Sequence, residues 1–104
     1  MKIRGANMDL AFTSCKIKFL YCKNRFMRSA TWEAKATEDG NMTSALYEVY
    51  ENLAKNEVRF ICTGMTRTTE EECANEKMLG IYADSFIEEY KHLTQMVHGY
   101  GAKS

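Results

Sequence analysis

The pattern of hydrophobic and polar positions predicts strands in the first part of the chain. Residues 15–22 alternate between polar and apolar types, which predicts a short strand or half of a hairpin. Residues 25–30 (RFMRSA) read as a second short strand. A polar stretch follows, and its Asp39-Gly40 pair predicts a turn.

After this turn the pattern takes the period of a helix. Thr43 is a favourable N-cap, and Asn56 is the expected stop. The apolar residues that recur on one face between them are Leu46, Val49, Tyr50 and Leu53. Residues 58–63 then carry the β-branched and aromatic side chains of another strand, which Gly64 ends.

The rest of the chain reads as a long polar connection and a second helix. Within the connection, residues 65–83, Thr69–Glu72 is a candidate for the start of a short helix. The second helix is predicted to begin near Asp84 or Ser85, where Ser85–Glu88 fits a capping box. Its apolar face is formed by Phe86, Tyr90, Leu93 and Val97. Its C-terminal stops are Gly99 and Gly101.

The resulting order of strand, helix, strand and helix is typical of the α/β class, in which crossover helices join parallel strands. Two such units do not complete an α/β architecture. A closed barrel, for example, needs eight strands and roughly 200 residues or more. The chain has 104 residues, which allows one small domain at most.

Composition and charge argue against several kinds of partner. The 14 basic and 14 acidic residues cancel, so the chain makes no electrostatic case for nucleic-acid binding. No apolar run approaches the ~20 residues that span a bilayer, and the N-terminus lacks the apolar segment of a signal peptide. We therefore expect a cytoplasmic protein that binds neither nucleic acid nor membrane.

The spacing of cysteine and histidine predicts no metal site. The cysteines, which include no CxxC pair, are Cys15, Cys22, Cys62 and Cys73. His92 and His98 complete no zinc spacing, and both are expected to be structural or solvated. We expect the thiols to be reduced and incidental.

Four stretches of the chain carry a resemblance to a known family. They are KNRFMRSATWE at 23–33, DGNMT with the helix that follows at 39–55, FICTGM at 60–65, and the segment from KMLGIYADSFI to YGAK at 77–103. In this order and spacing, over roughly residues 12–103, they resemble the NADH:flavin oxidoreductase family, also called the Old Yellow Enzyme family. The similarity is to the branch of NADH oxidase and 2,4-dienoyl-CoA reductase relatives.

This resemblance implies a fold and a cofactor. The fold is the N-terminal portion of a TIM (β/α)8 barrel, about two βα units preceded by a short strand or hairpin. Residues 1–104 then form one partial FMN-binding domain that is truncated before the third barrel strand. In the complete enzyme, NAD(P)H gives hydride to FMN at the C-terminal ends of the strands, and the flavin passes it to a small electron-poor acceptor.

By position, five residues of this chain correspond to FMN contacts of the family. They are Ser29, Ala30, Thr31, Trp32 and Met65. Small side chains at 29 and 30 allow backbone amides to approach a flat ring. From the residues alone, Trp32 also reads as a core tryptophan and Gly64 as an ordinary strand terminator. The family's catalytic residues and phosphate loops are expected beyond residue 104, so the isolated chain is expected to bind FMN weakly or not at all.

The chain departs from the family's pattern in one strand, and its abrupt end leaves another interpretation open. Arg59 stands where the family has a small residue, and an unpaired charge in a buried strand is costly. An incomplete barrel also leaves strand edges open to self-association. The alternative to an enzyme fragment is a non-enzymatic α/β interaction module derived from the same family.

Overall fold

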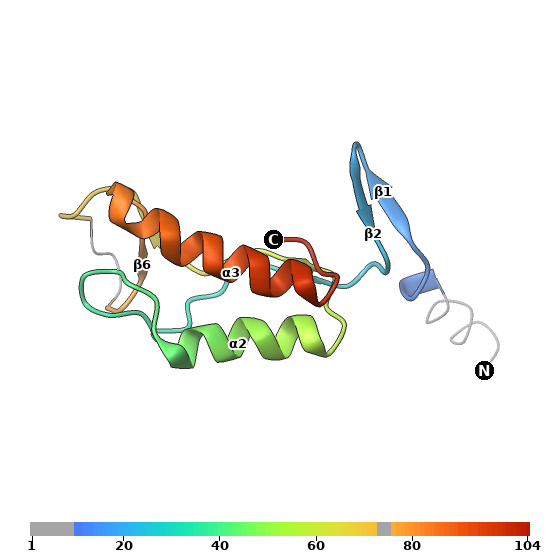
Figure 1. Ribbon diagram of the computed structural model, residues 1–104, viewed down its shortest axis with the longest axis horizontal. Helices are drawn as coiled ribbons and strands as arrows, with labels where there is room; N and C mark the ends of the chain where they lie inside the picture. Colours follow the sequence, from blue (N-terminus) through green and yellow to red (C-terminus); the bar gives the residue numbers. More distant parts are fainter. Residues whose placement is uncertain (1–9, 73–75) are drawn as a thin grey trace.

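The computed structural model describes residues 10–72 and 76–104 (Figure 1). The strands are β1 (Cys15–Ile17), β2 (Leu20–Cys22), β3 (Met27–Arg28), β4 (Phe60–Ile61), β5 (Thr66–Arg67) and β6 (Leu79–Gly80). The helical elements are α2 (Ser44–Lys55), the 3-10 turn η1 (Asp84–Phe86) and α3 (Ile87–Gly99). Strands pair as β1 with β2, β3 with β4, and β5 with β6.

Three parallel segments lie side by side in chain order. β3 and β4 pair in parallel, with Met27 opposite Phe60. Lys103 then takes the next place, through a parallel bridge to Phe60. Its amide donates to Arg59 O at 2.8 Å, and its carbonyl accepts from the Ile61 amide at 2.8 Å. Because α2 joins the first segment to the second and α3 joins the second to the third, the structure confirms the predicted βα units.

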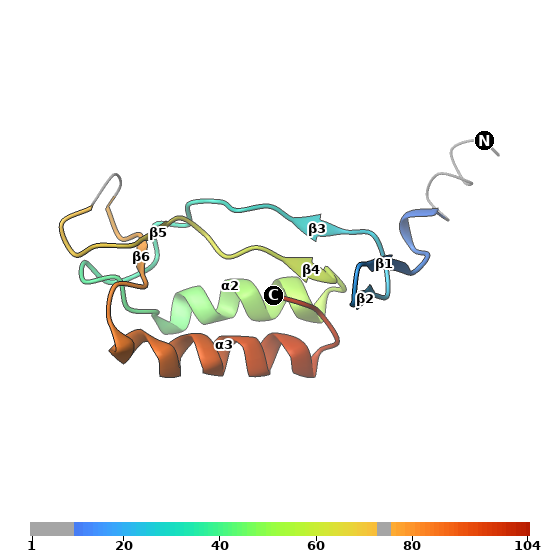
Figure 2. The same cartoon turned by 90° about the horizontal axis from the view of Figure 1, so that it is seen from above.

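Both helices cover the same face of β3 and β4 (Figure 2). Successive residues of a strand point to opposite faces, so Arg28 and its register partner Ile61 face the helices while Met27 and Phe60 face away. Met27 is accordingly 58% exposed. The core between strands and helices is formed by Ala36, Leu46, Tyr50, Ala54, Ile61, Leu79, Leu93, Val97 and Ala102. One face of the parallel segments is therefore packed and the other is open.

Helix α2 begins and ends as predicted. The Thr43 hydroxyl accepts from the Leu46 amide at 3.2 Å, and Asn56 is the C-cap. α3 also ends as predicted, since Gly101 follows the C-cap with a φ of +88° that favours glycine. Most of the predicted apolar stripes are confirmed: Leu46, Tyr50, Leu93 and Val97 are in the core, and Leu53 and Tyr90 pack against it. Val49 is only half-buried, and Phe86 is buried but lies in η1, before α3.

The predicted capping box at the start of α3 is wrong. Asp84–Phe86 forms a 3-10 turn, whose last amide donates to Ala83 O at 3.2 Å. Ser85 therefore lies inside this turn and not at an N-cap position. No side chain caps either η1 or α3.

The short helix predicted at Thr69–Glu72 is also absent from the described residues, where this stretch is a series of bends. Local side-chain bonds replace helical ones: the Thr69 hydroxyl accepts from the Glu72 amide at 3.1 Å, and the Glu72 carboxylate accepts from the Thr68 amide at 3.1 Å. The connection instead contains β5 and β6, which pair in parallel beyond the end of β4.

Residues 15–22 form a complete hairpin that projects from the helical body (Figure 1). Its two-residue turn places Lys18 at a φ of +52°. Phe19, at the tip, is 97% exposed. The alternation in the sequence thus predicted the hairpin, although neither face of its tip is packed.

Arg59 is accommodated at the start of β4 without entering the core as an unpaired charge. Its guanidinium donates to Ala54 O in the last turn of α2, at 3.5 Å, and to Tyr100 O just after α3. A loose ion pair with Glu57 (3.8 Å) adds to this. Carbonyls at a helix C-terminus carry partial negative charge, so a cation is favourable there.

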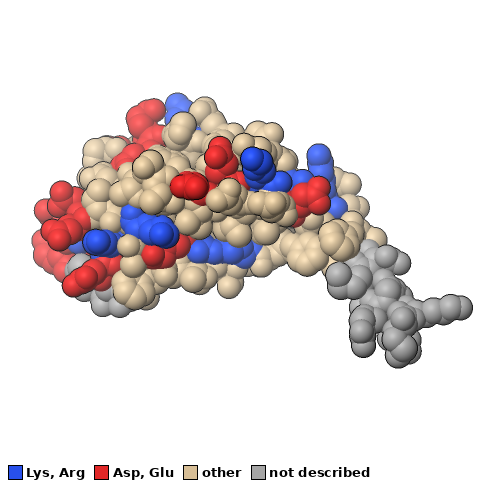
Figure 3. Space-filling view, turned by 90° about the horizontal axis from the view of Figure 1, so that it is seen from below, with Lys and Arg blue, Asp and Glu red and all other residues tan. Residues whose placement is uncertain are grey.

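The surface view shows charges of both signs on the face seen from below, with acidic side chains gathered at the end that holds β5 and β6 (Figure 3). None of the described helices is long and apolar enough to cross a membrane. The described thiols, Cys15, Cys22 and Cys62, are free, and Cys73 lies outside the described residues.

Leu93→Ala is expected to destabilise the chain strongly, because Leu93 is fully buried between α3 and the strands. Removing its side chain should lower the free energy of unfolding by about 2–5 kcal/mol. The matched control is Ile87→Ala in the same helix, where the side chain is 58% exposed. Urea unfolding followed by circular dichroism should separate the two variants; equal midpoints would contradict this packing.

Candidate functional site

The candidate site lies where β3 and β4 end. Residues 29–32 follow β3 and residues 64–65 follow β4, and the two segments are in contact. A Cβ atom at position 64 would lie 2.5 Å from Thr31 O and would also overlap the Glu33 carboxylate. Glycine is therefore required at this position for the segments to approach, which goes beyond the role of an ordinary strand terminator.

An ion pair holds the ends of the first segment together. Arg28, the last residue of β3, pairs with Glu33 across residues 29–32. The same guanidinium donates to Cys62 O at 2.9 Å, which ties this segment to the continuation of β4. Both side chains are largely buried, with 14% and 9% exposure. The four residues between them consequently form a loop on a fixed base.

The hydroxyl of Tyr50 connects this base to the helical layer. It donates to Glu33 Oε2 at 3.0 Å and accepts from the Gly64 amide at 2.8 Å. The Arg28 guanidinium lies 5.6 Å from the centre of the Tyr50 ring, within range of a cation–π interaction. One side chain from α2 thus positions both segments.

The environment of Tyr50 keeps its hydroxyl protonated. Burial raises its pKa from 10.0 to about 12, and the Glu33 carboxylate acts in the same direction, against the lowering effect of the Gly64 amide. A neutral hydroxyl can donate to the carboxylate and accept from the amide at the same time. The phenol is therefore a structural group here across the physiological range.

The five predicted contact residues all lie at these two strand exits and are exposed: Ser29, Ala30, Thr31, Trp32 and Met65. Trp32 is 46% exposed, so its interpretation as a core tryptophan is wrong. Its indole nitrogen donates to Glu76 O at 2.9 Å. Met65 is 41% exposed, and its carbonyl accepts from the Leu79 amide at 3.0 Å.

The backbone of the first segment offers hydrogen-bond donors. Among the residues that the structure describes, none of the amides of residues 29–32 donates to another protein group. The side chains at 29, 30 and 31 are small or short, so they leave this backbone accessible. Accessible amides at a strand exit are suited to a flat acceptor with carbonyl or ring-nitrogen atoms.

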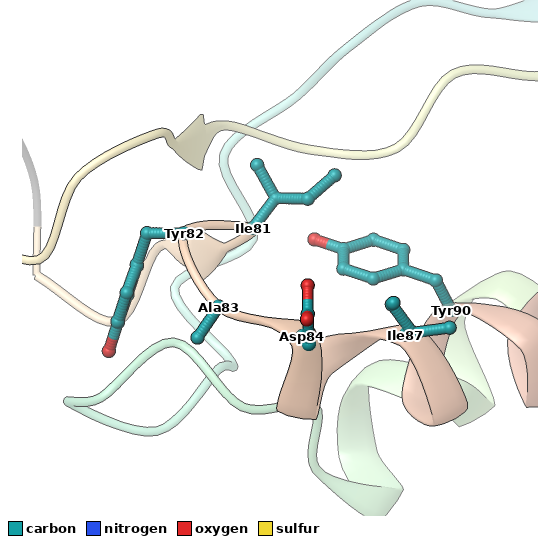
Figure 4. A pocket seen from close by; sticks show the side chains of 6 residues that line it. All are labelled: Ile81, Tyr82, Ala83, Asp84, Ile87 and Tyr90. Atoms are coloured by element: carbon teal, nitrogen blue, oxygen red, sulfur yellow. The ribbon is translucent and has the colours of Figure 1, made fainter.

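A separate pocket of about 310 Å³ lies at the start of α3 (Figure 4). It is lined by Ile81, Tyr82, Ala83, Asp84, Ile87 and Tyr90. None of the predicted contact residues lines it. Asp84 is the one carboxylate of its lining. The hydroxyl of Tyr82 donates to Asp39 O at 2.7 Å, and that of Tyr90 donates to Gly80 O at 3.0 Å. We place the functional site at the strand exits, since the predicted contact residues lie there and the tyrosine hydroxyls of the pocket are bound to backbone carbonyls.

Across the described ranges, no three metal-ligating side chains cluster. His92 is exposed and stacks edge-on against Tyr47 at 5.0 Å, and His98 is exposed at the end of α3. Both placements agree with the structural or solvated roles expected of the two histidines.

Parallel segments in chain order, helices on one face and a site at the strand exits define the first part of a parallel α/β barrel. Residues 11–104 match the NADH:flavin oxidoreductase / NADH oxidase family, and the chain belongs to that family. No curated protein sequence is similar enough to count as a match.

Solved structures agree on the fold. The Old Yellow Enzyme from Pichia sp. AKU4542 superposes with a TM-score of 0.81 at 24% identity, over 89% of this chain and 24% of that one. The old yellow enzyme from Trypanosoma cruzi superposes with a TM-score of 0.78 at 22% identity, over 92% of this chain and 26% of that one. The old yellow enzyme homologue from Zymomonas mobilis superposes with a TM-score of 0.77 at 24% identity, over 88% of this chain and 25% of that one. This chain therefore spans about a quarter of these proteins and adopts part of their TIM-barrel fold.

Sequence reasoning missed the residues that hold the site together. Arg28 and Glu33 lie within the motif that carries the resemblance, but nothing in that motif shows that they pair across the loop. Their opposite charges on either side of a short segment are the available signal. Tyr50 was predicted only as part of an apolar stripe. A tyrosine in a fully buried stripe usually has a partner for its hydroxyl, which is the clue to its second role.

Gly64→Ala is expected to destabilise the site. The new Cβ would overlap Thr31 O and Glu33, so the first segment must move, at a cost of about 1–3 kcal/mol. Gly99→Ala is the matched control, because a Cβ at that position meets nothing within 4 Å. Urea midpoints should fall for the first variant only. A Gly64→Ala chain as stable as the parent would show that the segments are not in contact.

Stability is expected to fall as the pH rises from about 10 to 12, because Tyr50 ionises in the unfolded chain near its ordinary pKa of 10.0 but only near 12 in the folded chain. The shift corresponds to at most about 3 kcal/mol. Burial also raises the pKa values of Tyr47 and Tyr90, so Tyr50→Phe should reduce this decline without abolishing it. Urea unfolding of the parent and Tyr50→Phe chains between about pH 10 and 12 measures this decline in the free energy of unfolding. Identical pH slopes of the two chains would rule out Tyr50 as a source of the decline.

Proposed function

We propose that this chain provides the first part of the flavin site of an FMN-dependent NAD(P)H:flavin oxidoreductase. The observation that supports this most directly is the contact between residues 29–32 and Gly64, which brings two strand exits together. In barrel enzymes the active site is built at this end of the strands. Membership of a flavin oxidoreductase family agrees with the proposal.

The residues present fit a flavin ring. Residues 29–31 offer accessible amides beside small side chains, and Gly64 allows the two strand exits to lie against each other. Trp32 and Met65 add exposed apolar surface at the same end of the strands. FMN, when bound, supplies hydride transfer between NAD(P)H and an electron-poor acceptor.

In this proposal the residues of this chain position the flavin ring and stabilise its reduced form. They do not themselves exchange protons. The amides of residues 29–31 would donate hydrogen bonds to a bound ring and would favour the negative charge of its reduced form. The Arg28–Glu33 pair and the Tyr50 hydroxyl hold residues 29–32 in place before the flavin binds. Few groups of the protein then lose conformational freedom on binding. Because the Tyr50 hydroxyl is buried and engaged on both sides, it is not available as a proton donor to substrate.

We propose further that the isolated chain is inactive and binds FMN weakly or not at all. The chain spans about a quarter of its structural relatives, and phosphate sites in TIM barrels commonly lie after the seventh and eighth strands. A phosphate group contributes much of the binding energy of a nucleotide cofactor through charged and helix-terminal contacts. Without these contacts, a partial ring site supplies little affinity.

The open face of the parallel segments favours a second candidate function, that of a non-enzymatic interaction module. Met27 is 58% exposed on the face opposite the helices, and Trp32 and Met65 are exposed at the strand exits. Apolar surface of this kind favours association. Self-association through this face or through open strand edges is the corresponding expectation.

The decisive experiment joins this chain, after Lys103, to the remaining barrel units of a family member. We expect the hybrid to bind FMN and oxidise NAD(P)H, and the isolated chain to do neither. Ala30→Phe should weaken FMN binding at least about tenfold, because it covers the donor amides. Ala45→Phe, on the exposed side of α2, is the matched control. FMN fluorescence quenching gives both dissociation constants.

Three outcomes would contradict these proposals. Equal FMN affinity in the Ala30→Phe and Ala45→Phe hybrids would remove residues 29–32 from the flavin site. A folded hybrid that binds no FMN, together with a stable dimer of the isolated chain, would favour the interaction module. FMN bound tightly by the isolated chain would refute the claim that it binds weakly.

A further inference from the structure

Two thiols face each other across the N-terminal hairpin. Cys15 on β1 and Cys22 on β2 are register partners in the antiparallel pair. Directly opposed residues in such a pair have Cα atoms about 4.5–5.5 Å apart. A disulfide requires a Cα separation of about 4.4–6.8 Å. The backbone therefore already has the spacing that a bond between the two sulfurs needs.

The two cysteines differ in accessibility, which gives them different roles. Cys15 is half-buried, whereas Cys22 is 2% exposed. Burial raises the pKa of Cys22, and the neighbouring Cys15 raises it further, through its charge and a hydrogen bond between the side chains. Thiolate character and access together decide which sulfur reacts first. Cys15 is the better placed of the two to attack an external disulfide.

We propose that Cys15 and Cys22 form a redox-sensitive disulfide when the protein meets a low-molecular-weight disulfide such as oxidised glutathione. The Cys15 thiolate attacks one glutathione sulfur, forming a mixed disulfide and releasing one glutathione thiolate. The Cys22 thiol, as its thiolate, then attacks the Cys15 sulfur and displaces the second glutathione. Two protein thiols are oxidised and one glutathione disulfide is reduced to two thiols; the two protons lost by the cysteines pass through solvent to the two released glutathione thiolates.

The position of the pair gives this bond a structural consequence. Cys15 and Cys22 both line a pocket of about 220 Å³ between the hairpin and the parallel segments, together with Phe26, Met27 and Phe60. A bond between the sulfurs would fix the wall of this pocket that the hairpin supplies. The Lys103 ammonium lowers the pKa of Cys22, against the larger effect of burial. The inference does not depend on the proposed flavin function.

The experiment uses the full chain with Cys62→Ser and Cys73→Ser, so that only the two hairpin thiols remain. After incubation with oxidised glutathione, peptide mass spectrometry should find Cys15 and Cys22 joined in one cross-linked peptide, with the loss of two hydrogen atoms. Cys22→Ala in this background should instead accumulate glutathione on Cys15. Cys15→Ser should react at least about tenfold more slowly, because Cys22 is buried.

Circular dichroism of each variant before oxidation shows that the helices are retained. Free hairpin thiols in the folded background chain after oxidation would overturn the proposal. A stable glutathione adduct on Cys15 while Cys22 is still present would overturn it as well, because Cys22 would then not be in reach. Equal rates of modification in the Cys22→Ala and Cys15→Ser chains would overturn the assigned order of attack.

Discussion

The buried hydroxyl of Tyr50 is the interaction on which the strand exits depend. It is the point at which a residue of α2 meets both the Glu33 carboxylate and the Gly64 amide. The partners complete one another: Arg28 neutralises Glu33, Tyr50 binds Glu33 and Gly64, and the missing side chain at 64 admits the backbone of Thr31. A buried polar network stabilises a structure when all its members are satisfied and destabilises it when one is lost. The packing of α2 against the strands and the geometry of the candidate site therefore depend on the same contacts.

The sequence predicted the periodic elements well and the aperiodic ones poorly. α2 and α3 carry apolar stripes long enough to fix their type, and Thr43 and Gly101 mark ends that the backbone uses. β5 and β6 contain two residues each, which is too short for any alternation to be visible. The error at Ser85 has a similar origin, since a capping motif cannot show whether a 3-10 turn will precede the helix.

The candidate site was predictable in position but not in construction. Residues 29–32 and Met65 were found through a motif, and the structure brings their two segments to neighbouring strand exits. What supports them is a set of long-range contacts: Arg28 reaches Cys62 O, and Tyr50 reaches Gly64. Such contacts depend on which helix face meets which strand, and this information lies in the packing and not in local sequence. The sequence motif identifies the exposed residues of the site. The residues that hold them in place can be identified only from the three-dimensional structure.

Arg59 illustrates how a departure from a family pattern can acquire a role. A charge at the start of β4 would be costly inside the core, but its guanidinium extends past the strand to carbonyls at the ends of both helices. One side chain therefore terminates two helices that come from separate βα units. The same Arg59 nitrogen donates to the last turn of α2 and to the residue after α3, so unwinding at the end of one helix affects the end of the other. The two βα units are therefore thermodynamically linked at the edge farthest from the candidate site.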